Sequence, residues 1–143
     1  IVYGSHHIGI EADLLPEDMD FDRMEMIVLP GGLGGVATAR ASQEAMSALK
    51  TAWDSGKYVA AICAGPTVLS DLGITDGKKA TCYPGCEDGM GTAKIQENAA
   101  VVQDGRLITG TSAGCAIPFG LKLVEALKGS AEAERIARQI VIR

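Results

Sequence analysis

Residues 58–66 have the sequence YVAAICAGP, and this stretch decides the fold. Its first five residues form a short, continuous apolar run, which predicts a strand of a parallel sheet buried on both faces. Pro66 favours the start of a helix, because the missing N–H of proline would have no partner in the first helical turn. The sequence therefore predicts a buried strand that turns sharply into a helix, with Cys63 at the turn.

A second apolar run, residues 26–29, has the same pattern and ends at Pro30-Gly31-Gly32. Strands that alternate with helices indicate an α/β fold with a mostly parallel sheet covered on both faces. In such sheets, ligands bind outside the carboxyl ends of the strands. We therefore expect Gly31 and Cys63 to lie side by side at that edge.

Four helices are predicted from the helical spacing of apolar residues and from the residues that favour the start and end of a helix. They cover residues 42–54, 67–72, 113–127 and 131–139.

The remaining segments carry weaker signals. Residues 1–12 predict a strand or hairpin, and residues 13–24 a loop with at most a short helical turn. Asp104-Gly105 predicts a hairpin between two short strands. Gly34-Gly35 is expected to extend a loop or link it to the next helix, and residues 140–142 are expected to form a strand-like tail.

Composition restricts the class of protein. The chain has 143 residues, 47% apolar and 22% charged, which predicts one soluble globular domain over residues 1–143. The net charge is −5 and no basic run is longer than two residues, so we expect no direct nucleic-acid binding. No apolar run is long enough to span a membrane. Four cysteines without a secretory signal favour reduced thiols in the cytoplasm.

Cys63 is the candidate nucleophile. Its position between a strand and a helix resembles the nucleophile elbow of hydrolases, in which a tight turn presents the reacting side chain. Small neighbours, Ala61 and Gly65, allow so sharp a turn. The beginning of a helix also favours the thiolate form of a cysteine. The alternative is a small buried hydrophobic residue, as free cysteine often is.

Backbone N–H groups near Cys63 are candidate donors to an oxyanion. The N–H groups at Gly31 and Gly32, together with that of Ala64, can point at a carbonyl oxygen attacked by the thiolate. Gly31, Gly65 and Pro66 are then expected to line the pocket. The alternative for Pro-Gly-Gly is a plain turn.

Other polar residues carry less chemistry. No histidine follows His7, and His6-His7 is expected to be an exposed turn rather than a catalytic pair. Cys82-x-x-x-Cys86 lacks a second ligand pair, so no metal site is expected. We interpret Cys82, Cys86 and Cys115 as structural thiols, with a resolving role for Cys82 or Cys86 as the alternative. Thr111 or Ser112 is expected to cap the helix that follows.

With these motifs in place, the chain resembles the ThiJ/PfpI superfamily, in the branch of the parkinsonism-associated protein deglycase and its bacterial relatives. The resemblance rests on residues 28–32 (VLPGG), 60–66 (AAICAGP) and 109–129, in family order and with family-like spacing. It implies a flavodoxin-like three-layer α/β sandwich, a homodimer and no cofactor. Cys63 matches the reactive, readily oxidised cysteine of the family, and Gly32 and Ala64 match its oxyanion donors.

The sequence departs from the family in two ways. The resemblance implies an N-terminal strand–helix–strand unit that carries a glutamate bonded to the cysteine. We expect the sequence to start after that unit, with the unit cleaved off, kept as a separate chain or omitted, so no residue is assigned as the general acid or base. The family histidine near the cysteine also has no match, and Ala64 stands where protease-type members have one. Proteolysis is therefore disfavoured.

Three functions fit these residues. The first is a glyoxalase or deglycase acting on a small carbonyl substrate such as a 2-oxoaldehyde, with Cys63 as nucleophile. The second is a redox sensor or chaperone in oxidative stress, in which Cys63 is oxidised. The third is a domain used only for dimerisation. Some bacterial relatives of the family also carry a label of thiazole monophosphate biosynthesis.

Overall fold

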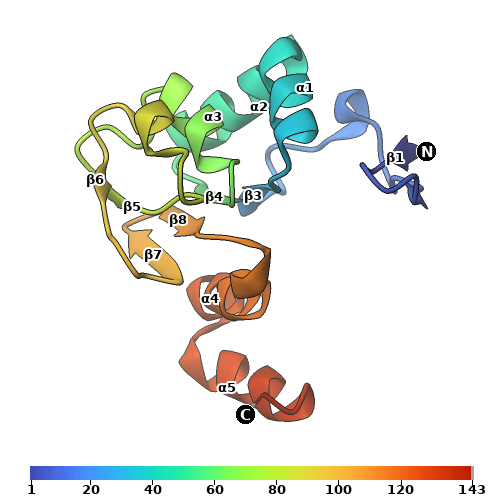
Figure 1. Ribbon diagram of the computed structural model, residues 1–143. Coiled ribbons are helices and arrows are strands. Elements are labelled where there is room, and N and C mark those ends of the chain that lie inside the picture. The colour runs from blue at the N-terminus through green and yellow to red at the C-terminus, as the bar shows by residue number, and fades with distance from the viewer. Residues whose placement is uncertain (143) are drawn as a thin grey trace.

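The computed structural model describes residues 1–142 and contains a four-stranded sheet (Figure 1). Its order is β3-β4-β8-β7, in which the first three strands are mutually parallel and β7 is antiparallel to β8. The register pairs Leu29 with Ala61 and Ile62 with Gly110, so the carboxyl ends of the parallel strands meet at one edge. The strands are β3 (Met26–Leu29), β4 (Tyr58–Ile62), β7 (Val101–Asp104) and β8 (Leu107–Gly110).

Helices cover both faces of this sheet. Because side chains alternate along a strand, Val59 and Ala61 of β4 belong to one core cluster and Ala60 to another. Helices α1 (Leu33–Ala41), α2 (Gln43–Asp54) and α3 (Pro66–Asp71) contribute to the first cluster, and α4 (Ala116–Lys128) contributes Phe119 to the second. Helix α5 (Ser130–Gln139) packs on α4 and extends away from the sheet (Figure 1). The α/β fold with a mostly parallel sheet is confirmed.

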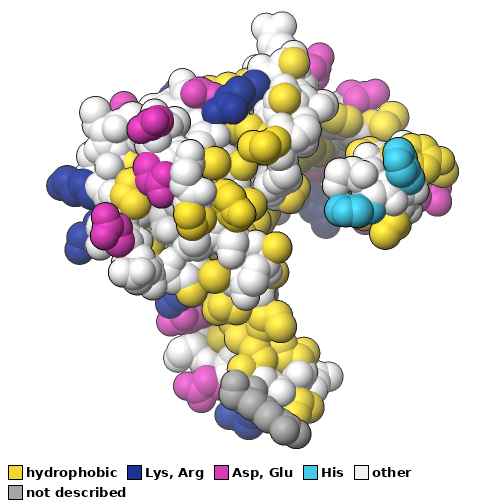
Figure 2. Space-filling view, in the orientation of Figure 1, with side chains coloured by type: hydrophobic (Ala, Val, Ile, Leu, Met, Phe, Trp, Pro, Cys, Tyr) yellow, Lys and Arg dark blue, Asp and Glu magenta, His cyan; other side chains and the backbone are white. Residues whose placement is uncertain are grey.

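Short elements surround this framework. An antiparallel hairpin of β1 (Val2–Tyr3) and β2 (Gly9–Ile10) projects from the body, and Figure 2 shows hydrophobic side chains gathered on it. The other short elements are η1 (Pro16–Asp18), β5 (Lys79–Ala80), η2 (Glu87–Met90), β6 (Lys94–Ile95) and η3 (Ala113–Cys115). The predicted hairpin at Asp104-Gly105 joins β7 to β8. No helix described within residues 1–142 is both long and apolar enough to cross a membrane.

Helix α2 begins as predicted. The Ser42 side-chain oxygen accepts a hydrogen bond from the backbone N–H of Ala45 at 3.1 Å, which satisfies one of the free donors of the first turn. Pro66 is likewise the first residue of α3.

Three expectations about local structure are wrong. Gly34 and Gly35 lie inside α1 rather than in a loop, because the turn is made at Gly32, two residues before Gly34, with φ +90°. Residues 140 and 141 form a turn after α5, with Val141 at φ +57°, and residue 142 is not in a strand. Thr111 does not cap a helix, because its hydroxyl is bonded to Thr81 and to a backbone carbonyl. The helix that follows is divided into η3 and α4, and neither has a side-chain cap.

Candidate functional site

Cys63 directly follows β4 and adopts a left-handed backbone conformation with φ +65°. A non-glycine residue in this region is strained by about 1–3 kcal/mol and needs support from its surroundings. Two hydrogen bonds supply that support: the Cys63 N–H donates to the Gly110 carbonyl at 2.9 Å, and the Tyr83 N–H donates to the Cys63 carbonyl at 2.8 Å. The geometry is the strained strand-to-helix turn that the sequence predicts.

Glycine is required beside this turn. A Cβ atom on Gly31 would lie 2.5 Å from the Cβ and 3.2 Å from the Sγ of Cys63, so the Cys63 side chain lies directly over Gly31. A Cβ atom on Gly65 would lie 2.9 Å from the Leu29 carbonyl oxygen. The prediction that the ends of β3 and β4 bring Gly31 and Cys63 together is therefore confirmed.

Several backbone N–H groups at this edge, those of Gly32 and Ala64 among them, have no protein partner in the described part of the chain. Within residues 1–142, neither the Gly32 N–H nor the Ala64 N–H donates a hydrogen bond to a protein acceptor. In a trans peptide the C=O and N–H groups point in opposite directions. Because Tyr83 binds the Cys63 carbonyl, the Ala64 N–H is directed away from Tyr83. Free N–H donors near a nucleophile can stabilise the oxyanion that forms when a carbonyl is attacked.

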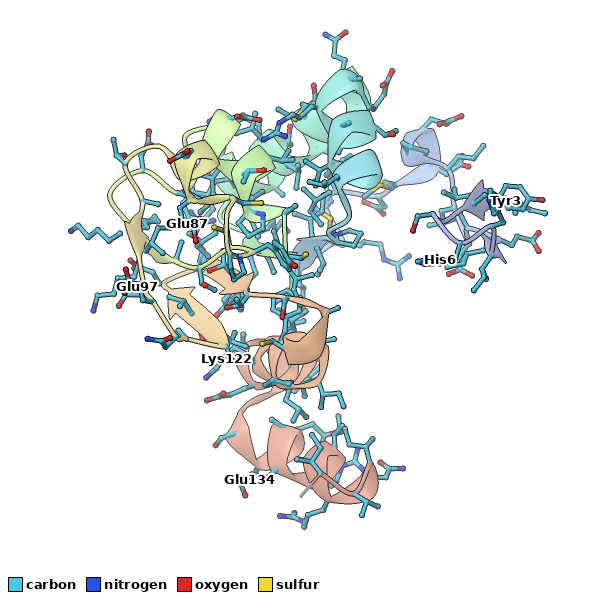
Figure 3. All side chains as sticks on the ribbon, viewed as in Figure 1. Tyr3, His6, Glu87, Glu97, Lys122 and Glu134 are labelled. Carbon is cyan, nitrogen blue, oxygen red and sulfur yellow. The ribbon has the colours of Figure 1, made fainter. Side chains whose placement is uncertain are left out.

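Cys63 is partly exposed as a residue, and its sulfur has no hydrogen-bond partner among the side chains of residues 1–142. His6 and His7 lie in the exposed turn of the β1–β2 hairpin, far from the sheet, as the labelled His6 in Figure 3 shows. The expectation that these histidines form an exposed turn is confirmed. Neither is placed to move a proton at Cys63 in this arrangement.

A groove lies away from the Cys63 turn. It has a volume of about 820 Å³ and is bounded by the η1 segment, β3 and α2, with Phe21, Val28 and Leu49 among its lining residues. Cys63, Gly31, Gly65 and Pro66 are not among its lining residues. Gly65 and Pro66 are buried beneath the turn, where they shape its backbone.

The other cysteines are all free thiols. Burial raises the pKa of the Cys82 thiol to about 11, with further contributions from Glu87 and Cys86. Cys82 is only 4% exposed and stays protonated at neutral pH. The structure thus fits the interpretation of Cys82 as a structural thiol.

Sequence reasoning missed a polar connection between α1 and α3. Arg40 of α1 binds Thr67 and Asp71 of α3, and Thr67 in turn binds the Ala64 carbonyl. A hydroxyl side chain three residues after Ala64, at the start of a helix, is a signal that could have identified Thr67. Nothing local in the sequence indicates Arg40, because its partners are 27 and 31 residues away.

Comparison with known proteins identifies the family. The model of the DJ-1/PfpI family matches residues 1–126. Protein dj-1beta of Drosophila melanogaster is 35% identical over 96% of this chain and 74% of its own length. A deglycase of Pyrococcus abyssi is 32% identical over 90% of this chain and 77% of its own length. The chain spans only about a third of the longer DJ-1 homologs A and B of Arabidopsis thaliana, at 36% and 32% of their lengths.

Solved structures of DJ-1 proteins resemble this chain as well. The crystal structure of Drosophila melanogaster DJ-1beta has a TM-score of 0.91 and 33% identity, covering 97% of this chain and 75% of that one. An oxidised DJ-1 of Toxoplasma gondii has a TM-score of 0.88 and 33% identity, covering 96% and 74%. The chain belongs to the DJ-1/PfpI family, and its sheet and helices have the flavodoxin-like arrangement of that family.

Proposed function

We propose that the protein is a cysteine-dependent, cofactor-free enzyme of the glyoxalase or deglycase type, which acts on small 2-oxoaldehydes or their adducts. The observation that carries this proposal is the strained, partly exposed Cys63 beside two backbone N–H groups without partners. The deglycase name of the Pyrococcus relative supports the same class of reaction.

The proposed reaction begins with attack of the Cys63 thiolate on the aldehyde carbon of methylglyoxal. The carbonyl electron pair moves to oxygen, and the N–H groups of Gly32 and Ala64 stabilise this oxyanion. A base then transfers the proton from the former aldehyde carbon to the neighbouring ketone carbon through an enediol. The first carbon is oxidised to a thioester while the second is reduced to an alcohol. Water hydrolyses the thioester, which releases lactate and restores the thiol.

The test is lactate formation from methylglyoxal by the wild type, by Cys63→Ala and by Cys115→Ala. Cys115 is the matched control, because it is a partly buried free thiol outside the turn. Loss of the nucleophile should reduce turnover by at least about a hundredfold, whereas Cys115→Ala should stay within about twofold of the wild type. Equal turnover by Cys63→Ala would end this proposal.

A second candidate function is redox sensing. It is favoured by the partial exposure of Cys63 and by the oxidised state of the Toxoplasma gondii relative. In this function a peroxide transfers oxygen to the Cys63 thiolate, which becomes a sulfenic and then a sulfinic acid. Peptide mass spectrometry after limited peroxide should find oxygen on Cys63 before Cys82, Cys86 or Cys115. An even distribution over the four thiols would argue against it.

A further inference from the structure

We infer that Arg40 is a positioning residue for the Cys63 site. Through Thr67 and Asp71 it fixes α1 against α3, and so fixes the spacing between the N–H groups of Gly32 and Ala64. The inference rests on the oxyanion role proposed above for those two groups.

The contacts of Arg40 join the two helices directly. From the last turn of α1, its Nε donates to Asp71 Oδ2 at 2.5 Å and its Nη2 donates to Thr67 Oγ1 at 2.9 Å. Both acceptors belong to α3. A guanidinium presents its donors in a rigid plane, so two simultaneous contacts fix the orientation of the neighbouring helix as well as its distance.

The Thr67 hydroxyl carries this constraint to Ala64. Arginine can only donate, so Thr67 Oγ1 accepts from Arg40 and uses its own hydrogen for the Ala64 carbonyl, at 2.7 Å. This bond orients the peptide that follows Ala64. The Tyr83 N–H orients the peptide that precedes it, through the Cys63 carbonyl. The backbone on both sides of the Ala64 N–H is therefore constrained.

Helix α1 connects the Arg40 contacts to Gly32, the second proposed donor. Helix α1 begins immediately after it, and at 1.5 Å per residue Arg40 lies about 12 Å further along the helix. The first three residues of α1 have little packing: Leu33 is 77% exposed, and a Cβ atom on Gly34 or Gly35 would meet nothing within 4 Å. Buried Val36, whose N–H donates to the Gly32 carbonyl at 2.9 Å, anchors the beginning of the helix. The direction of α1 from there depends on contacts nearer its carboxyl end, which are buried Ala39 and the Arg40 bridge.

If Arg40 served only to stabilise the whole fold, its substitution would lower the free energy of unfolding. The side chains of Arg40 and Asp71 are 40% and 42% exposed, and ion pairs this exposed contribute little to the free energy of unfolding. Arg40→Lys keeps the charge but cannot reproduce both contacts of the guanidinium. It should therefore leave the urea midpoint unchanged while it alters the site.

The experiment compares wild type with Arg40→Lys, Thr67→Val and Thr67→Ser, using amide ¹H–¹⁵N spectra and methylglyoxal kinetics. In Arg40→Lys and Thr67→Val, the amide resonances of Gly32 and Ala64 should shift while that of Ile108 does not. The kcat should fall about tenfold, with KM unchanged within about twofold, since a displaced donor weakens the transition state more than the ground state. Thr67→Ser retains the hydroxyl, so its amide resonances and its kcat should match those of the wild type.

Unmoved Gly32 and Ala64 resonances in Arg40→Lys would overturn the inference, whatever the kinetics. Shifted resonances in a protein whose wild type forms no lactate would support the positioning role and contradict the proposed reaction. A kcat in Thr67→Ser as low as that in Thr67→Val would also count against Arg40 acting through the Thr67 hydroxyl.

Discussion

Gly31→Ala tests the packing of the turn around Cys63. The added Cβ would lie 2.5 Å from the Cys63 Cβ and 2.9 Å from the Ile62 carbonyl oxygen. Ordinary contacts of a Cβ atom begin near 3.4 Å, so the ends of β3 and β4 must separate by nearly 1 Å. Neither obstacle is the end of a flexible side chain, because one is a Cβ and the other is backbone. The strands cannot separate without straining the bonds that support Cys63.

The magnitude follows from two opposing effects. Overpacking of a tightly packed site costs about 1–3 kcal/mol, and two backbone-proximal clashes place Gly31→Ala at about 3 kcal/mol. Gly31 has no positive φ, so the lower entropy of alanine in the unfolded chain returns about 0.4–1 kcal/mol. We therefore expect a net loss of about 2 kcal/mol in the free energy of unfolding.

The matched control is Gly35→Ala. Gly35 lies four residues along the chain, inside α1, and a Cβ atom there would meet nothing within 4 Å. Alanine should therefore stabilise the helix by about 0.5–1 kcal/mol. The assay is equilibrium unfolding in urea, followed by the fluorescence of Trp53, the single tryptophan, and by circular dichroism. If Gly31→Ala matched the wild type or Gly35→Ala in stability, the account of the turn would be refuted.

Two further predictions concern the helices and the buried thiol. Ser42→Ala removes the bond to the Ala45 N–H and should lower the free energy of unfolding by about 1 kcal/mol, as measured in urea; Ser42→Asp, which retains an acceptor, should lose much less. The pKa of Cys82 is raised from its ordinary 9.0 to about 11, so the folded protein holds this proton more tightly than the unfolded chain. The resulting contribution to the free energy of unfolding is complete below pH 9 and is lost as the pH rises to about 11. Urea unfolding at a series of pH values should show that Cys82→Val lacks this part of the alkaline loss; parallel curves for wild type and variant would contradict it.

Much of the framework follows from local sequence. Two apolar runs that each end in small residues are sufficient to predict parallel strands and the turn at Cys63, because burial on both faces leaves little choice of residue. Ser42 could be predicted as a cap because the signal for a cap is also local. Gly34 and Gly35 could not be placed in a helix, because glycine has low helix propensity and α1 depends on the burial of Val36 and Ala39 against the core.

The candidate site is predictable in part. Cys63, Gly31 and Gly32 are close in space because the strands that carry them are neighbours, and this follows from the alternation of strands and helices. The contact from Tyr83 to the Cys63 carbonyl and the bridge from Arg40 to Thr67 join residues 20 and 27 positions apart. Such pairings depend on how loops and helices pack, which no local pattern encodes.

The most direct test of the central claim is competitive alkylation of the four thiols in the folded protein. A limiting amount of iodoacetamide is added at neutral pH, and each cysteine-containing peptide is quantified by mass spectrometry, with urea-unfolded protein as the reference. Cys63 should be modified first, at least about tenfold faster than Cys82, which is buried and protonated. Modification of all four thiols at similar rates, or of Cys86 or Cys115 before Cys63, would contradict the assignment of Cys63 as the reactive group.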